Sequence, residues 1–406
     1  MDRDQLTTSK AIQRKTGVTF HLATRFFPNR IRHPTYVMYA FFRIADDVVD
    51  DPNPDPPDVQ QAELDRIREA ALGNRETDEP VLQAFDELRQ RYDIPDREIR
   101  EFIHAMEQDI DWDVEQGVDQ DDADLVRAEF ADVDEMVAYF RGSAVAVAYM
   151  MLAVMNPDDP ELAKPHARAL GEAFQLTNFL RDVREDVLEY QRVYLPSSTL
   201  DAHSVDVNEI SQLEFSDRFA DAMREELDRA EELYREGVAG IQHLPCDCQF
   251  PVLLAAVLYA EHHRRIEARG YDVLSERPSL TTARRLAVAA RTLWHWKRSG
   301  DPEASFYRAS AVSPSREQSV ETEMGANVEA APSTCRISSG VRALTRHLGS
   351  LATTVHRNTR GSPRLQSWEE SDKARINPRP IAARLPNAGR RIYKKIHQYV
   401  KYGWRT

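Results

Sequence analysis

The sequence has little of what disulfide-rich, membrane-spanning or collagen-like proteins require. Three cysteines among 406 residues are too few for a disulfide framework, and Cys246-Asp247-Cys248 lacks the spacing of a zinc site. With only 15 glycines and 22 prolines, the chain is not collagen-like. No window approaches the apolar run of about 18 to 20 residues that spans a membrane, and the polar first residues lack the apolar core of a secretory signal. We therefore expect a cytoplasmic protein.

The charge of the chain is divided between two parts. The net charge is -14, but residues 301–406 hold 18 Lys and Arg against 9 Asp and Glu. This part carries +9, which leaves -23 for residues 1–300. Because so acidic a surface repels nucleic acid, we expect no nucleic-acid partner. Since 42% of the residues are apolar, the chain can still bury a sizeable core.

Residues 1–305 are predicted to form one all-α domain. From about residue 10, apolar residues recur at helical spacing, short Pro, Asn or Asp breaks separate the segments, and no strand-like alternation is present. The prolines between residues 52 and 57 forbid helix continuation there. The predicted helices cover residues 33–50, 58–72, 79–92, 96–114, 132–154, 158–190, 211–240, 251–268 and 281–298.

Residues 306–406 are predicted to be a basic linker and a partly disordered tail, because Ser, Thr, Ala, Arg and Pro replace the helix formers. Near the end, residues 388–402 have the pattern of a basic amphipathic helix, with Ile392, Ile396 and Val400 on one face. Three interpretations stay open: a helix that binds peripherally to a membrane surface, a helix that packs on the acidic domain, and a disordered segment.

A first cluster of carboxylates ends the segment over 39–51. Asp46 and Asp50 are four residues apart and share a helix face, and Asp47 and Asp51 form a neighbouring pair. Like charges so placed repel one another. A hard divalent cation, Mg²⁺ or Mn²⁺ in its place, would offset that cost, since it prefers carboxylate oxygens. The alternative is a solvated acidic helix end.

A second polar stripe lies on another predicted helix. Gln175, Asn178, Asp182 and Asp186 follow offsets of three and four, and the stretch over 167–174 before them is mostly small and apolar. An amide and two carboxylates on a face that is otherwise apolar are unusual for surface decoration. Two helices with an aspartate pair each could hold Mg²⁺ ions together with a diphosphate.

The arginines beside these aspartates have two compatible roles. Arg43 and Arg181 lie within about one helical turn of the carboxylates. They could donate to phosphate oxygens or pair with the same aspartates.

These residues carry a family resemblance. Segments 39–50 and 175–196 together resemble the two aspartate motifs of the squalene/phytoene synthase family, and the resemblance covers roughly residues 10–300. Weaker matches are Thr19-Phe20, Asp109, the Tyr139 to Ala148 stretch and the segment from Tyr259 to Arg277. Gly17 stands where the family usually has a phosphate-binding serine.

The resemblance implies a single helical bundle of the isoprenoid synthase type around a deep apolar cavity. It implies catalytic roles for Asp46, Asp50, Asp182 and Asp186. The implied metal ligands are the same four aspartates and Asn178. The implied substrate-binding residues are Tyr39, Arg43, Gln175, Asn178, Arg181, Tyr259 and Arg277.

The implied reaction is head-to-head condensation of two allylic prenyl diphosphates. Two geranylgeranyl diphosphates would pass through a cyclopropylcarbinyl diphosphate to phytoene, with release of diphosphate, as in carotenoid biosynthesis; NADPH is not expected for this product. The alternatives are squalene or dehydrosqualene formation from farnesyl diphosphate and a non-catalytic helical binding or assembly protein. The sequence identifies no partner enzyme.

Two further groups of residues have an expected place in such a cavity. Small residues would leave room for a hydrocarbon, or would serve close helix packing: Gly142, Ser143, Ala144, Ala146 and Ala148. Aromatic residues would line the region where carbocations form, or would pack in the core: Phe20, Phe41 and Tyr259.

Overall fold

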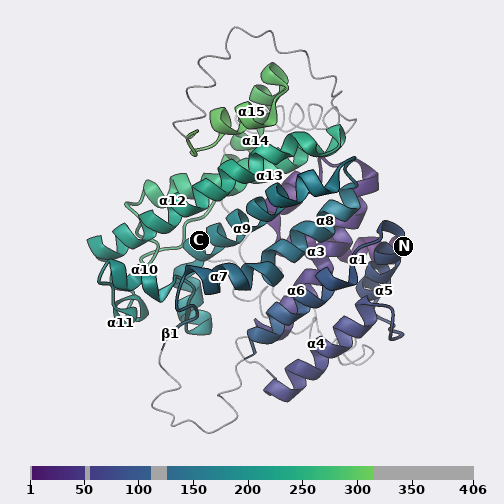
Figure 1. Ribbon diagram of the computed structural model, residues 1–406, viewed down its shortest axis with the longest axis horizontal. Coiled ribbons are helices and arrows are strands. Elements are labelled where there is room, and N and C mark those ends of the chain that lie inside the picture. The colour runs from purple at the N-terminus through teal and green to yellow at the C-terminus, as the bar shows by residue number, and fades with distance from the viewer. Residues whose placement is uncertain (1, 51–54, 111–125, 315–406) are drawn as a thin grey trace, which may run out of the picture. The chain divides into compact units, whose positions relative to one another are not determined.

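The structure is a computed structural model that describes residues 2–50, 55–110 and 126–314, and within these ranges it is an all-α bundle, as predicted (Figure 1). The α-helices are α1 (Arg3–Thr16), α2 (Val18–Thr24), α3 (Asn29–Val49), α4 (Pro57–Ala71), α5 (Pro80–Tyr92), α6 (Asp96–Gln108), α7 (Val133–Phe140), α8 (Val147–Met155), α9 (Pro160–Glu185), α10 (Ser197–Ala202), α11 (Val207–Ser211), α12 (Asp217–Ala239), α13 (Cys246–Glu267), α14 (Thr282–Ser299) and α15 (Pro302–Ala309). The other helical turns are the π-helices η2 (Arg141–Ala146) and η3 (Asp186–Tyr190) and the 3₁₀-helix η4 (Gly240–His243).

The all-α bundle includes one short strand pair that the sequence did not predict. Two short strands, β1 (Arg127–Ala128) and β2 (Arg192–Val193), pair in parallel. Each is two residues long, so no alternating pattern can develop over it. The pair ties the segment before α7 to the segment that follows η3.

Helix α1 was not predicted, because its inward face is polar. Gln5, Ser9 and Gln13 are its buried residues, so apolar periodicity is absent. Asp2 begins the helix with a capping box in which its carboxylate accepts from Gln5 N and the Gln5 side chain accepts from Asp2 N. Gln13 then donates to Thr24 Oγ1 at 3.1 Å, which joins α1 to α2.

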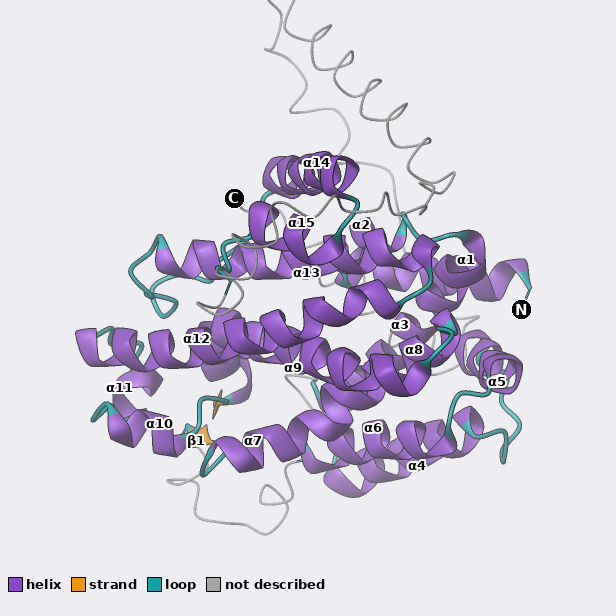
Figure 2. Cartoon of the chain, turned by 45° about the horizontal axis from the view of Figure 1, so that its top comes forward, coloured by secondary structure: helices purple, strands orange, loops and turns teal. Residues whose placement is uncertain are grey.

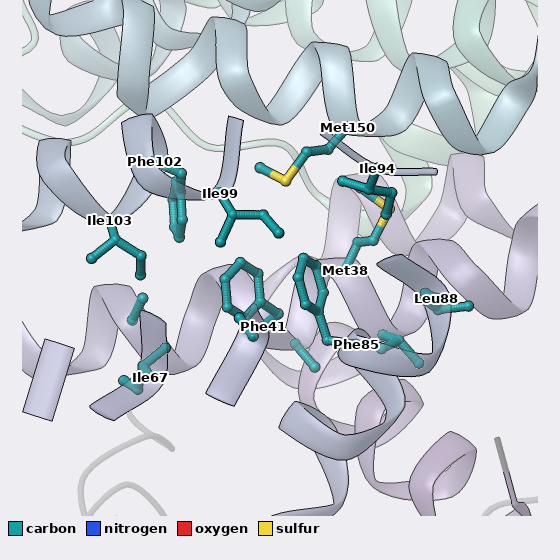
Figure 3. Close-up of a cluster of buried hydrophobic side chains, with 14 of the residues drawn as sticks. Met38, Phe41, Ile67, Phe85, Leu88, Ile94, Ile99, Phe102, Ile103 and Met150 are labelled. Carbon is teal, nitrogen blue, oxygen red and sulfur yellow. The ribbon is translucent and has the colours of Figure 1, made fainter. Parts of the chain in front are cut away.

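The bundle is organised around α9, which contacts α8, α12 and α13 (Figure 2). Helices α3, α4, α5 and α6 pack together beside it around an aromatic cluster. In this cluster the rings of Phe41 and Phe85 stack with centroids 3.8 Å apart, and Phe102 and Met150 lie close by (Figure 3). Burial of these side chains stabilises this part of the bundle.

One expectation about membrane segments needs correction. The helical stretch Val133–Met155 is long and apolar enough to cross a membrane by length and composition, with a hydropathy of 1.5. The expectation concerned an uninterrupted apolar run, whereas this stretch is apolar on average over its window. In the structure its η2 and α8 parts pack against α6 and α9.

Helix α15 continues the packed structure beyond residue 305, where the sequence suggested that the domain ends. Phe306, Ala309 and Val312 are buried in the same hydrophobic cluster as α13 residues. Past residue 314, the expected tail and the amphipathic helix over 388–402 lie outside the described residues.

Candidate active site

A cavity of about 810 Å³ runs through the bundle, and every predicted site residue lines it. Those residues come from α3 and its C-cap, from α9, η3 and α13, and from the segment after α13: Tyr39, Arg43, Asp46, Asp50, Gln175, Asn178, Arg181, Asp182, Asp186, Tyr259 and Arg277. The tertiary structure therefore brings together at one cavity residues that are more than 200 positions apart in the sequence.

The first aspartate cluster lies at the C-terminal end of α3. Arg43 pairs with Asp47 at 2.6 Å and reaches Asp50 at 4.0 Å. Asp46 has no ion pair with any described residue, and burial, followed by the charge of Asp50, raises its pKa well above the usual range. Since a helix C-terminus favours cations, carboxylates in this place are electrostatically unfavourable without a positive partner.

The second cluster lies at the C-terminal end of α9 and on η3. Asp182 accepts hydrogen bonds from Arg181 Nε and Arg277 Nε, both at 2.7 Å. Arg277 also reaches Glu185, with 2.8 Å between Nη1 and Oε1. Asp186 forms no direct ion pair with an arginine among the described residues. Burial and then the charge of Asp182 raise its pKa to about 8, and the charge of Arg181 offsets only part of this effect.

The two clusters act on each other across the cavity. The charge of Asp50 on α3 contributes to the raised pKa of Asp186 on η3. It contributes also to the raised pKa of Asp109, which burial sets at about 7. The carboxylates therefore share one region of negative potential that their arginines neutralise only in part.

The residues at this end of the cavity fit a divalent cation. Asn178 Oδ1 is buried and has no hydrogen-bond partner among the described residues, so a hard oxygen ligand is left without a partner beside Asp182 and Asp186. Within the described part of the chain, no three acidic, His or Cys side chains converge as a complete metal site. Mg²⁺ does not need such a set, because it is usually held by one or two carboxylates together with phosphate oxygens and water.

A second polar group at the cavity was missed as a site. Tyr139 OH donates to Asp109 Oδ2 at 2.9 Å, and Arg192 Nη2 donates to the Asp109 carbonyl oxygen at 2.7 Å. Arg192 also donates to Tyr194 OH at 3.2 Å. The family resemblance includes Asp109 and Tyr139 among its weaker matches, and this match is the sequence signal by which the group could have been predicted. Further unpredicted polar residues on the cavity wall are Glu185, Glu189, Tyr190, His262 and Arg285.

The aromatic residues are divided between the cavity and the core. Phe20 and Tyr259 line the cavity with ring centroids 4.6 Å apart. Phe41 does not: it is fully buried in the cluster of Figure 3, so of its two predicted roles it has the one in the core. A Cβ at Gly17 would lie 2.5 Å from Tyr39 Cζ, so the tyrosine ring occupies the space that a serine would need.

The small residues serve both expected purposes, according to the helix face on which they lie. Ser143, Ala144 and Ala148 line the cavity. Gly142 allows close packing instead, because a Cβ there would meet the carbonyl oxygen of Glu101 on α6. The π-helix η2, which holds most of these residues, changes the helical phase between the two faces.

A squalene/phytoene synthase family model matches residues 13–284. The chain belongs to this family. Its relatives include the phytoene synthase of Cereibacter sphaeroides, 30% identical over 284 residues, which are 67% of this chain and 75% of the relative. The phytoene synthase of Mycobacterium tuberculosis is 30% identical over 290 residues, 70% of this chain and 89% of the relative. The chain is thus a prenyltransferase of this family.

Solved structures support the fold. A dehydrosqualene synthase in complex with a ligand matches with a TM-score of 0.62 and 22% identity, over 73% of this chain and 98% of that one. The squalene synthase HpnC from Alicyclobacillus acidocaldarius matches with a TM-score of 0.54 and 22% identity, over 66% of this chain and 95% of that one. The isoprenoid synthase bundle that the sequence predicted is confirmed.

Proposed function

We propose that this protein condenses two geranylgeranyl diphosphates head to head, through a cyclopropylcarbinyl diphosphate, to phytoene and diphosphate. The observation that carries the proposal is the cavity itself: two aspartate-bearing helix ends line one part of its wall, and apolar side chains such as Phe20, Met151 and Phe174 line other parts. Such a division suits a substrate with a charged head and a long hydrocarbon chain.

Asp46, Asp50, Asn178, Asp182 and Asp186 are the residues that would hold Mg²⁺, or Mn²⁺ in its place. The bound cation would supply Lewis-acid stabilisation of a departing diphosphate. The aspartates, at two helix C-termini, favour a cation there by their charge and by the helix dipoles. Asn178 adds a neutral oxygen, which keeps the ligand set compatible with phosphate oxygens as further ligands.

Arg43, Arg181 and Arg277 would bind the diphosphate of the substrate. In the structure each of them is paired with a carboxylate of one of the two clusters. Their guanidinium groups would donate to phosphate oxygens at the same place, because the fork geometry suits that partner. Charge is then concentrated where the carbon–oxygen bond ionises.

The apolar part of the wall would exclude water from carbocations and hold two chains in register. Phe20, Phe174 and Tyr259 form a connected aromatic group on that wall, with Phe174 and Tyr259 centroids 4.8 Å apart. Ring faces attract positive charge, so this group is suited to stabilise a cation near the diphosphate end.

The alternative within the family is a C15 enzyme that forms squalene or dehydrosqualene from farnesyl diphosphate. The relatives that share about 30% identity are named phytoene synthases, which favours the C20 reaction. The solved structures are too distant in sequence to favour either substrate.

The test is a product assay. Purified protein is incubated with Mg²⁺ and either geranylgeranyl or farnesyl diphosphate, and the hydrocarbon is identified by mass spectrometry. We expect phytoene from the C20 substrate. A C30 hydrocarbon formed in preference would replace the proposal by the C15 alternative, and no hydrocarbon from either substrate would reject both.

A further inference from the structure

The cavity wall next to Arg277 carries two side chains to which the proposed reaction gives no role. Arg285 on α14 and His262 on α13 both line the cavity. Arg285 is half-buried, and its Nε atom has no hydrogen-bond partner in the described structure. His262 is 4% exposed, and its buried Nδ1 atom is likewise without a partner there.

Arg285 differs from the other arginines at this end of the cavity. Arg181 and Arg277 are tied to Asp182 by short hydrogen bonds. Arg285 forms no ion pair with any residue in 2–50, 55–110 or 126–314. Burial lowers its pKa, and no carboxylate acts in the opposite direction. Its positive charge is therefore not neutralised by a described carboxylate and can interact with an anion.

A buried clamp holds both residues in place. Arg284 Nε and Arg291 Nη2 on α14 donate to the fully buried Glu261 of α13, at 2.7 and 2.9 Å. Arg285 directly follows Arg284, and His262 directly follows Glu261. The clamp therefore fixes the positions at which Arg285 and His262 meet the cavity, so that an incoming ligand finds a preorganised pair.

His262 can act as a hydrogen-bond donor. Burial and the nearby charge of Arg181 lower its pKa to about 2, so the ring is neutral and one nitrogen keeps a proton. A buried Nδ1 atom without a hydrogen-bond partner and a half-buried guanidinium group without an ion pair both cost stability. An anion with several acceptor oxygens would satisfy both groups at once.

We propose that Arg285 and His262 form a subsite for a diphosphate group, separate from the aspartates. The inference rests on the proposed function, which supplies this ligand from two sources: the second prenyl diphosphate and the released diphosphate. Both sources offer the same oxygens. The subsite binds the group through protein donors alone, so it works without the cation.

The test is a titration of the full-length protein with inorganic diphosphate in excess chelator, followed by calorimetry. We expect Arg285→Gln to weaken binding about tenfold, the effect of one charge-assisted contact, and His262→Leu to weaken it by a smaller factor. Arg298→Gln is the matched control, because Arg298 is an exposed arginine of the same helix over the Trp294 ring. Wild-type affinity in Arg285→Gln would overturn the proposal.

His262→Leu also separates a ligand role from a structural one. Because it removes an unpartnered buried polar group, we expect Tm to stay level or rise while the affinity for diphosphate falls. A fall in Tm with unchanged affinity would assign His262 a structural role and remove it from the subsite.

Steady-state kinetics distinguish the two sources of the ligand. A raised KM in Arg285→Gln indicates the second substrate, and weaker product inhibition by diphosphate indicates the released group. Failure of the proposed function is distinguishable: no hydrocarbon product, with diphosphate affinity still lowered in the variants, would reject the reaction and keep the subsite. Normal product with equal affinity in every variant would reject the subsite alone.

Discussion

The charged end of the cavity and its apolar wall are built in opposite ways. At the charged end, Asp46 and Asp186 have raised pKa values, and Asn178 Oδ1 has no partner in the described structure. Along the apolar wall, side chains such as Phe174 and Tyr259 pack against one another. The packed helices supply stability, whereas the polar groups of the charged end are not fully satisfied by partners within the described structure, as is common at functional sites.

The largest effect is expected from removing divalent cations. Excess chelator should abolish formation of the hydrocarbon, and added Mg²⁺ should restore it, because the aspartates of the charged end would otherwise stay unneutralised. Circular dichroism recorded in parallel should show unchanged helix content, since the packed wall does not depend on the cation. NaCl should act only gradually, through screening. Undiminished turnover in chelator would contradict the metal-dependent mechanism.

The next largest effect is expected from single carboxylates. Asp46→Asn and Asp186→Asn should each lower kcat by about a hundredfold or more, because charge is lost at nearly constant volume. Asp47→Asn is the matched control, because it removes the same charge from α3. Asp47 pairs with Arg43 and does not line the cavity. Equal losses of kcat in Asp46→Asn and Asp47→Asn would show that turnover depends on the total negative charge of α3 and not on the carboxylates that line the cavity.

A smaller effect is expected on the apolar wall. Val147 lines the cavity and is half-buried, so Val147→Phe should fill part of the space for the longer chain. We expect kcat/KM for geranylgeranyl diphosphate to fall about tenfold relative to farnesyl diphosphate. Leu162→Phe, at an exposed position of α9 away from the cavity, is the control. An equal loss for both substrates would mean that the change disturbs chemistry instead of chain length.

The smallest effect concerns pH and stability. The pKa of Asp186 is raised from 3.8 to about 8, so the folded protein binds a proton that the unfolded chain releases between these values. The stability of the metal-free protein should therefore fall as pH rises through this window, and Tm measured in chelator should be several degrees lower at pH 8 than at pH 5. Asp186→Asn should flatten the dependence. If Tm rises between pH 5 and pH 8 in the wild type but not in Asp186→Asn, the raised pKa of Asp186 is contradicted.

Part of this fold was open to prediction because it follows local rules. The helices with an apolar face, such as α3, α9 and α14, were found from periodicity alone, with ends shifted by a few residues. Helix α1 was not found from periodicity, because its buried residues Gln5, Ser9 and Gln13 are polar. The strands β1 and β2 escaped because their pairing joins positions about 65 residues apart, and nothing within either pair of residues signals a distant partner.

The candidate site was predictable for the same reason wherever residues lie at helical spacing. A spacing of four residues, which places two side chains on one helix face, is visible in the sequence for Asp46 and Asp50 and for Asn178 and Asp182. His262 and Arg285 carry no such signal. They belong to separate helices, and the buried carboxylate of Glu261 that positions them looks in the sequence like any other acidic residue.

The sequence by itself determined the fold class, the family and the two aspartate motifs, because each depends on residues close together along the chain. Only the tertiary structure decided which neighbours share an environment. It buried Phe41 in the core while Phe20 lines the cavity. It gave Asp182 a direct hydrogen bond from Arg277 that Asp186 lacks within the described structure, and it placed Arg285 and His262 on the wall of the same cavity. Burial, pKa and charge balance are properties of packed surroundings, and those surroundings come from segments that the chain brings together only when it folds.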